Sequence, residues 1–243
     1  MSIRKKILAT SIGPVLVLGV ITLLFMLTMV KSSLMDEVQD ALKGTAAATL
    51  AAYDQNTGDY LESTNGDIWK GSYNISKSEN LVDRIKENTG MDVTFFYGNK
   101  RIMTSALDKK GNRILGSEAG ERVVNQVIKG KKPFFSTNVS LDGTRNYGYF
   151  IPVYQNGTTD QVIGMVFVGT NKARKDAIVN KILGSIMMAL LVVMLLCIVT
   201  AMRMAASISK NIKNSVAVVG KLADGDLNVW VDEKLLKRKD EIG

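Results

Sequence analysis

The sequence predicts an α+β domain held between two membrane-spanning helices, and three observations lead to this. Residues 7–30 and residues 182–202 contain no charged side chain. Each run is long enough to cross the hydrocarbon core of a bilayer as a helix. Between them, helical periodicity gives way to short alternating segments separated by turns. That pattern is typical of a sheet whose helices are segregated to one side.

The first apolar run is expected to be an uncleaved membrane anchor. A cleaved signal peptide is the alternative, because Arg4, Lys5 and Lys6 resemble its basic start. Signal-peptide cores are about 7–15 residues long and end in small residues. This run is longer, and the following "TMVKSSLMDE" offers no such site. The basic start places residues 1–6 in the cytoplasm, and two spans return the C-terminus to the same side.

The composition restricts the kind of function. The net charge is +8 at pH 7, but the basic residues flank the apolar runs or alternate with acidic ones, so a nucleic-acid partner is not expected. The chain has no histidine, which excludes His-based catalysis and most zinc sites. No phosphate-binding loop or EF-hand spacing occurs. We therefore expect a binding protein without cofactor or metal, with a Ser-Lys or paired-carboxylate enzyme as the alternative.

Two helices and a loop are expected after the first apolar run. Residues 31–52 carry apolar side chains at three-to-four spacing and continue the first helix without a break. Residues 56–79 are polar and rich in Gly, Asn and Ser, which predicts a loop with at most one helical turn. The stretch "SENLVDRIKENTG" predicts a helix that is capped by Ser78 and ended by Gly90.

Five strands and one more helix are expected in the rest of the domain. "DVTFFY" and "KRIMTSAL" flank Gly98-Asn99, a two-residue turn typical of a hairpin. "SEAGERVVNQVIKG" predicts a helix that begins at Ser117 and stops at Gly130. "PFFSTNVS", "RNYGYFIPVY" and "QVIGMVFVG" then form a meander of three strands. The expected sensor domain covers residues 31–178.

This order of elements resembles the single Cache sensor domain of bacterial receptors, which has a PAS-like fold. The resemblance covers residues 31–171 and is carried by "TGMDVTFFYGNKRIMTSA", "YGYFIPVY" and "VIGMVFVG". It implies a long N-terminal helix and a five-stranded, mostly antiparallel sheet. It also implies that the domain lies outside the cytoplasm and binds a small molecule.

The segment after the second apolar run, residues 203–243, resembles a HAMP linker. Its seam positions have the 4-3-4-3 spacing of a heptad and are Ile208, Ile212, Ser215, Val219 and Leu222. "ADGDLN" resembles the connector and "DEIG" the start of the second helix. The usual proline near the start of the first helix is Asn211 here. With the second helix only begun at Asp240, the chain is expected to be the sensor half of a longer protein.

The two resemblances together imply a methyl-accepting chemotaxis protein. Such a protein is a homodimer and not an enzyme, and it controls a chemotaxis kinase through a coupling protein. The alternative is the input half of a sensor histidine kinase or of a cyclic-nucleotide-signalling enzyme. A Glu/Gln- and Ala-rich helical hairpin in the output module would indicate the first, and an H-box or GG-D/E-F motif the second. The heptad seam disfavours a third class, a membrane-anchored binding protein without signalling.

The candidate ligand site is expected on the sheet. In "RNYGYF", period-two alternation puts Tyr147 and Tyr149 on one face, and Gly148 leaves room on the other. Dicarboxylate sensors of similar architecture carry an arginine in the hairpin and a polar residue three positions later. Arg101 and Thr104 match that spacing, with threonine where such sensors often carry histidine. A guanidinium fork with hydroxyl donors suits a small organic acid or an amino acid. The candidate binding residues are Arg101, Thr104, Asn138, Tyr147, Tyr149 and Phe167.

Overall fold

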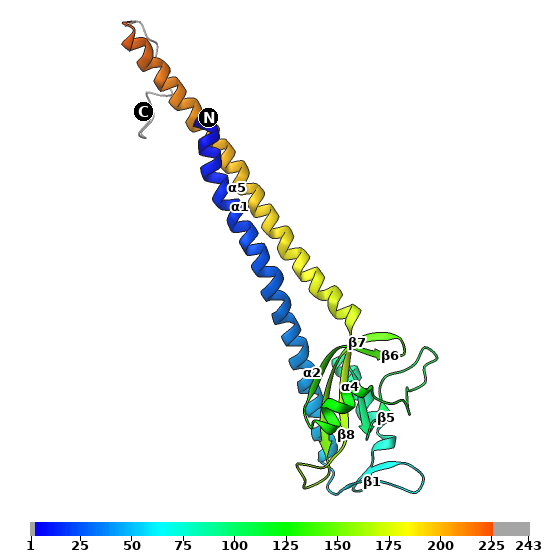
Figure 1. The fold of residues 1–243 in the computed structure, drawn as a ribbon. Coiled ribbons are helices and arrows are strands. Elements are labelled where there is room, and N and C mark those ends of the chain that lie inside the picture. The colour runs from blue at the N-terminus through cyan, green and yellow to red at the C-terminus, as the bar shows by residue number, and fades with distance from the viewer. Residues whose placement is uncertain (1–2, 226–243) are drawn as a thin grey trace. The chain divides into compact units, whose positions relative to one another are not determined.

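A five-stranded antiparallel sheet organises the segment between the two apolar runs (Figure 1). The computed structural model describes residues 3–225, and Lys31–Lys181 form one compact unit within it. The strand order is β5-β4-β8-β7-β6, so the last strand in the sequence lies at the centre. The five strands are β4 (Asp92–Tyr97), β5 (Lys100–Thr104), β6 (Phe134–Leu141), β7 (Thr144–Tyr154) and β8 (Val162–Asn171). All five predicted strands, including the hairpin around Gly98-Asn99, are confirmed.

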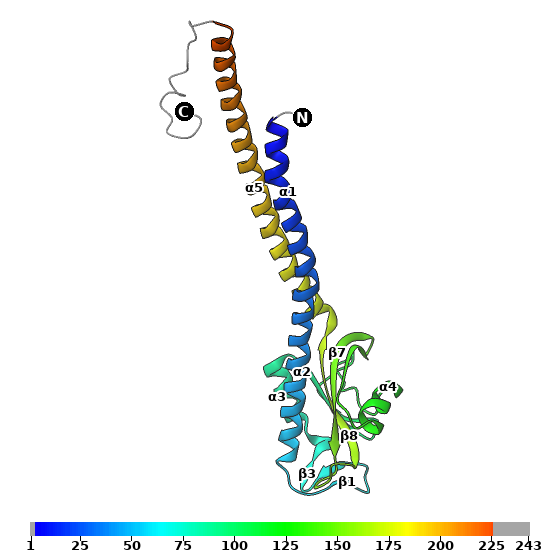
Figure 2. The ribbon, with the colours of Figure 1, turned by 60° about the vertical axis from the view of Figure 1, so that its left-hand side comes forward.

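Two helices cover one face of the sheet. These are α2 (Lys31–Asp54) and α3 (Glu79–Thr89), and both lie on the opposite side of the sheet from α4 (Figure 2). The expected end of α3 is confirmed, because Gly90 has a φ of +68° and its N–H bonds to Lys86 O. Ser78 stands at its start, but its hydroxyl bonds to Ile75 O and Tyr53 instead of capping the helix.

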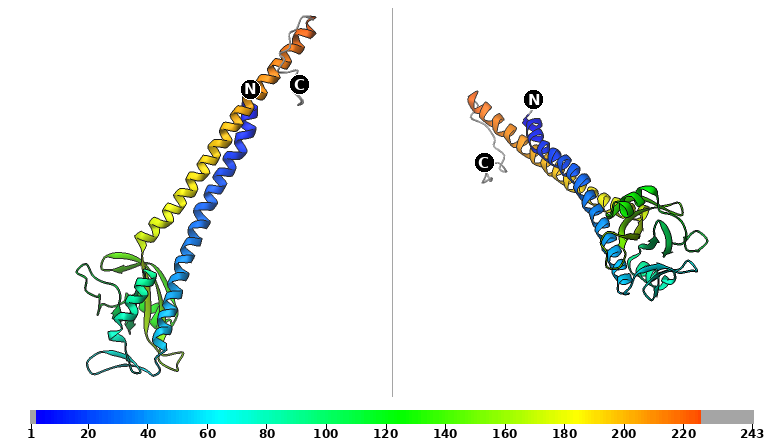
Figure 3. Two further views of the ribbon diagram at one scale, coloured as in Figure 1. Left: turned by 180° about the vertical axis from the view of Figure 1, so that it is seen from behind. Right: turned by 60° about the horizontal axis from the view of Figure 1, so that its bottom comes forward.

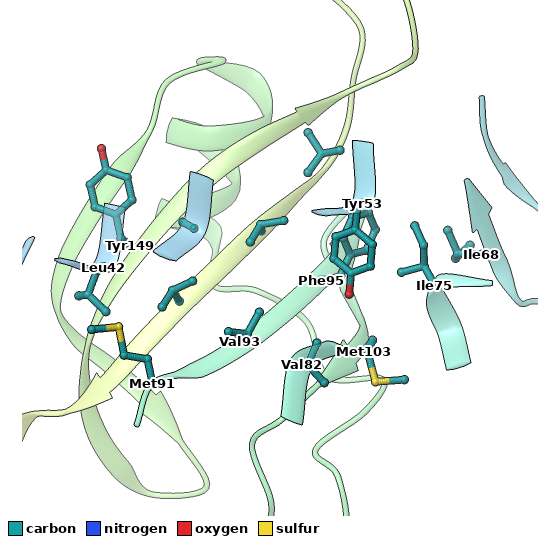
Figure 4. Close-up of a cluster of buried hydrophobic side chains, with 14 of the residues drawn as sticks. Leu42, Tyr53, Ile68, Ile75, Val82, Met91, Val93, Phe95, Met103 and Tyr149 are labelled. Atoms are coloured by element: carbon teal, nitrogen blue, oxygen red, sulfur yellow. The ribbon is translucent and has the colours of Figure 1, made fainter. Parts of the chain in front are cut away.

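The larger hydrophobic core lies between α2, α3 and this face (Figure 4). Leu42 and Tyr53 of α2 meet Val93 and Phe95 of β4, and all four side chains are fully buried or nearly so. The Tyr53 and Phe95 rings pack edge to face with centroids 5.1 Å apart. Burial raises the pKa of Tyr53 well above its ordinary value, partly offset by its hydrogen bond with Ser78. Burying such side chains is the main favourable term in holding α2 on the sheet.

The third predicted helix covers the other face of the sheet, so the expectation that all helices share one side is wrong. It consists of α4 (Glu121–Val123) and the π-helical η3 (Val124–Lys129). It begins at Glu121 and not at Ser117, because the Ser117 carbonyl instead accepts a hydrogen bond from Arg101 N of β5. Val127 is its only fully buried residue in the described structure, and it packs in a second, smaller core with Phe96 and Phe167.

The segment after α2 folds into a small sheet where a loop was expected. Its antiparallel strands are β1 (Tyr60–Glu62), β2 (Ile68–Lys70) and β3 (Tyr73–Asn74), followed by the 3-10 turn η2 (Ile75–Lys77). It follows directly on the end of α2 (Figure 3). Lys70 is buried, with its ammonium 4.2 Å from the Tyr60 ring centroid and 3.6 Å from Asp54. Because a buried lysine stands where the strand pattern needs an apolar residue, the alternation was hidden in the sequence.

The two apolar runs lie in helices long and apolar enough to cross a membrane. The first is α1 (Ile3–Phe25), which continues through the π-helical η1 (Met26–Val30) into α2. The second is α5 (Lys172–Ala223). Mean hydropathy over the most apolar windows is 2.4 and 3.0, and only 11% and 6% of these windows is buried. Gly225, with a φ of +85°, follows the end of α5, and the predicted "DEIG" helix start lies outside the described residues.

A half-buried ion pair ties α3 to the loop between β5 and α4. Arg113 donates to both carboxylate oxygens of Asp83, at 2.9 Å for one of them, and to Thr104 O. These bonds hold the pKa of Asp83 below its usual range. A depressed carboxyl pKa stabilises the fold above the unfolded value of about 3.9, and the effect is lost as pH falls through the folded pKa.

We therefore expect Asp83→Asn to lower the free energy of unfolding at pH 7, by at most about 1 kcal/mol because the Asp83 carboxylate is partly open to solvent and the pair is screened. The difference should vanish at low pH. Urea unfolding followed by Trp69 fluorescence at pH 7 and pH 3 measures it. Asp160→Asn is the control, since Asp160 is exposed and makes no ion pair in the described structure. A deficit that is equally large at both pH values contradicts the assignment.

Candidate functional site

A cavity of about 530 Å³ lies between the sheet and α4. Its deep wall is aromatic, because Phe96, Phe150 and Phe167 all point from the central strands toward this face and are at most 3% exposed. Strand β6 forms another wall, with polar side chains in "STN". The segment before α4 closes the cavity with Glu118, Ala119 and Gly120. The cavity therefore joins an apolar interior to a polar rim.

Two glycines make room for the ring of Phe167. Gly148 of β7 and Gly169 of β8 are directly opposed across the sheet. A Cβ added to either would lie 2.5 Å or 2.4 Å from a Phe167 ring atom. Any side chain at these positions would displace the ring into the cavity. The room that Gly148 was expected to leave is thus occupied by a predicted site residue.

Arg101 is the charged group of the deep wall. Its side chain is only 8% exposed, and its guanidinium lies over the Phe96 ring at 5.3 Å from the centroid. Its one hydrogen bond in the described structure is a long one, 3.4 Å from Nη1 to Ile114 O, and its buried Nε has no partner. Burial lowers the pKa of the guanidinium, and Asp92 partly opposes this. Burying a cation whose N–H donors have no acceptor costs free energy, and a bound acceptor would offset that cost.

A β-bulge in the hairpin explains why Arg101 and Thr104 share a face. In a regular strand, residues three apart point to opposite faces. Here Arg101 pairs with Phe96 and Met103 with Phe95, so Ile102 is an extra residue. Thr104 still does not line the cavity, because it is fully buried against Thr94, with the two hydroxyl oxygens 2.7 Å apart.

The two tyrosines of β7 share a face, but it is the face covered by α2. Both belong to the larger core, so neither lines the cavity. The Tyr147 hydroxyl donates to the Asp176 carboxylate at the start of α5. Burial, together with that hydrogen bond, raises the pKa of Tyr147 to about 12. The Lys172 ammonium also lies over the Tyr147 ring, 5.2 Å from its centroid.

Of the six predicted site residues, the structure brings three to one cavity. Arg101, Asn138 and Phe167 line it together. The prediction missed several further lining residues, chiefly Glu118, Arg122, Phe134 and Ser136. Two of these could have been found by pairing, since Phe134 lies opposite Phe150 and Ser136 opposite Gly148 in the β6–β7 register. Glu118 and Arg122 could not have been found in this way, because their positions depend on how the segment before and within α4 crosses the sheet.

The charged side chains at the rim of the cavity are open to solvent, unlike that of Arg101. Glu118 and Arg122 are both exposed, and the Arg122 guanidinium lies 5.3 Å from the Phe134 ring centroid. Neither forms an ion pair within the described residues. Those residues also hold no cluster of three potential metal ligands. The site thus offers guanidinium groups, hydroxyls, an amide and aromatic surface, which are groups for binding.

Comparison with known proteins gives a family match over part of this domain. Residues 73–182 match the family model of the single cache domain 3. No curated protein sequence matches the chain. Among solved structures, it is similar to an extracellular ligand binding receptor from Desulfohalobium retbaense DSM5692, with 14% identity and a TM-score of 0.42. That match covers 60% of this chain and 25% of the other, so this chain spans about a quarter of the receptor's length.

A second similar structure is the sensor domain of DcuS from E. coli, with 15% identity and a TM-score of 0.34. It covers 58% of this chain and 98% of the other. The family match agrees with the resemblance in the strand motifs, and it includes the hairpin, the α4 segment and all of the sheet.

Proposed function

We propose that this chain is the ligand-sensing and transmembrane signalling half of a bacterial chemoreceptor. The observation that carries the proposal is a Cache domain with a lined cavity, placed in the sequence between two helices apolar enough to span a membrane. Pockets that bind small molecules typically measure about 300–1,000 Å³, and this cavity is about 530 Å³. The domain would bind a small extracellular molecule, and α5 would carry the response inward.

The exposure of the apolar helices supports a membrane location. Large apolar side chains along α1 and α5 are open, for example Leu18 at 66% and Leu195 at 63%. A soluble protein rarely exposes so much contiguous apolar surface. We assign α1 and α5 as the two spans, with the Cache domain outside the cell and both termini inside, following the basic residues before α1.

One contact connects the cavity wall to the first turn of α5, and two more connect β7 to it. Thr137 lines the cavity, and its carbonyl accepts a hydrogen bond from Lys172 Nζ at 3.1 Å. Lys172 and Asp176 both contact Tyr147 of β7. A ligand that moves the bulged middle of β6 would therefore act directly on the residues that fix the start of α5. We infer that the signal leaves the domain by this route.

The cytoplasmic part of α5 supports a dimeric signalling protein. The heptad positions from Ile208 to Leu222 lie on one continuous helix, and Val219 and Leu222 are 63% and 48% exposed in the single chain. A second copy in parallel would cover this seam. A homodimer with a chemotaxis kinase and a coupling protein as partners follows from the chemoreceptor assignment. A sensor histidine kinase or cyclase is the alternative, since it would use the same input half.

Cysteine labelling tests the topology. In a Cys197→Ser background, Thr64→Cys lies on the exposed turn of the small sheet and Asn214→Cys on the exposed surface of α5. In intact cells, a membrane-impermeant thiol reagent should label the first and not the second. Both should react equally after the membrane is permeabilised. Labelling of both in intact cells contradicts the assigned topology.

Compound screening tests the cavity and the route to α5 together. A ligand at a hundred times its Kd should stabilise the folded chain by about 2.7 kcal/mol, which a thermal-shift screen of residues 1–243 in lipid nanodiscs detects. Ser136→Phe should abolish the shift by filling the cavity, and Thr159→Phe, on an exposed turn, should not. Tyr147→Phe should keep the shift but lose ligand-dependent changes in amide exchange over residues 172–181. If the ligand changes amide exchange over residues 172–181 equally in Tyr147→Phe and in the unaltered protein, the Tyr147–Asp176 hydrogen bond is not part of the route.

Co-purification tests the output class. The full-length parent protein is expected to retain a chemotaxis coupling protein on affinity resin. The retention should fall when Val219→Glu and Leu222→Glu break the seam, because the charges would prevent parallel pairing. Autophosphorylation or nucleotide cyclisation by the purified parent, without bound coupling protein, would instead assign it to the alternative class.

A further inference from the structure

The cavity has one buried cation in its interior, and most of its hydrogen-bonding capacity is unused among the described residues. Arg101 is more than nine-tenths buried, and only one of its five N–H donors has an acceptor in that part of the chain. The buried Nε–H has no acceptor, and an anion with two oxygens in a plane can pair with it and with a neighbouring Nη N–H at the same time. A carboxylate has that geometry. A neutral carbonyl or a hydroxyl has one oxygen and would leave some of the Arg101 N–H donors without an acceptor.

The surroundings of Arg101 then limit the rest of the ligand. The other buried lining side chains are the rings of Phe96, Phe150 and Phe167. Phe134 adds a half-buried ring on the β6 side. A ligand body in contact with these rings gains free energy chiefly by burying apolar surface. The deep part of the cavity is thus matched to hydrocarbon next to a single carboxylate.

The cavity offers no equally good place for a second carboxylate. Thr104, which would have supplied a second polar anchor in the hairpin, bonds to Thr94 and lies outside the cavity. The other lining cation, Arg122, is exposed at the rim, and the exposed carboxylate of Glu118 lines the cavity as well. Two arginines and one glutamate leave a net charge of +1 among the lining residues, which one carboxylate neutralises.

We propose that the ligand of this cavity is a monocarboxylate with an apolar body, bound with its carboxylate on Arg101 and its hydrocarbon part against the phenylalanine rings. This rests on the proposed sensor function and names the class of molecule sensed. Dicarboxylates and free amines are excluded as best ligands by the same arrangement. Phenylacetate is a suitable probe, because it carries one carboxylate and one aromatic ring.

Calorimetric titration of residues 1–243 in phosphatidylcholine nanodiscs tests the proposal first with unaltered protein. Phenylacetate should bind at least about tenfold more tightly than phenylacetamide, its neutral analogue, because a charge-assisted hydrogen bond contributes about ten- to a hundredfold. Its affinity should also exceed that of three other compounds. These are succinate, which has two carboxylates, acetate, which lacks the aromatic ring, and 2-phenylethylamine, which has the opposite charge. No detectable phenylacetate binding at millimolar concentration, or equal or tighter binding of any of the other four, overturns the proposal.

Variants then locate the interaction. Arg101→Gln should weaken phenylacetate binding about ten- to a hundredfold, while Arg145→Gln, a matched change at an exposed arginine outside the cavity, should leave it unchanged. Phe134→Leu should weaken phenylacetate more than it weakens hexanoate, since only the former loses ring stacking. Wild-type affinity in Arg101→Gln overturns the proposal. If a compound of another class stabilises the chain and Ser136→Phe abolishes the effect, the sensor function stands and only the carboxylate assignment fails.

Discussion

The burial of β8 on both faces is the constraint on which the rest of the domain depends. Residues 164–170 are all buried, as expected of a central strand covered on both sides. Val166 and Val168 point into the core under α2, and Met165 and Phe167 into the core under α4. Because successive side chains alternate, one strand determines which residues of its neighbours β4 and β7 belong to each face. The cavity lies on the second face, between the sheet and α4.

Much of the fold could be predicted because its local signals are strong. The Gly98-Asn99 turn, the Gly90 helix end and the continuous apolar run of β8 each depend on a few adjacent residues. The small sheet β1–β3 was missed because its burial involves Lys70, a residue that is buried only because Tyr60 and Asp54 surround it. The side of the sheet that α4 covers was also missed, since a short helix with one fully buried residue carries little information on the face it packs against.

The candidate site shows the same division between local and non-local information. Alternation correctly placed Tyr147 and Tyr149 on one face of β7. It could not tell which face α2 covers, and the structure places both on the face opposite this cavity. Arg101 reached the cavity with Phe96 only because a bulge at Ile102 adjusts the register, and a bulge has no signal in a strand of five residues. Pairing across β6 and β7 supplies the residues that single-strand reasoning lacks.

Alternation along β7 also gives the domain a way to connect its two faces. Gly148 lies on the cavity side of the sheet, where a Cβ added to it would meet the Phe167 ring, while Tyr147 faces the other side and bonds to Asp176. Two adjacent residues of β7 thus lie next to different parts of the domain: Gly148 next to a ring of the cavity wall, and Tyr147 next to the start of α5. Strand β6 repeats the arrangement, since Phe134 lines the cavity and Phe135 stacks on Tyr147 with ring centroids 6.3 Å apart. A close-packed sheet transmits small displacements because it has no free volume to absorb them. In the proposed signalling function, a displacement of the cavity wall would therefore reach the start of α5 through the sheet as well as through the Thr137–Lys172 hydrogen bond.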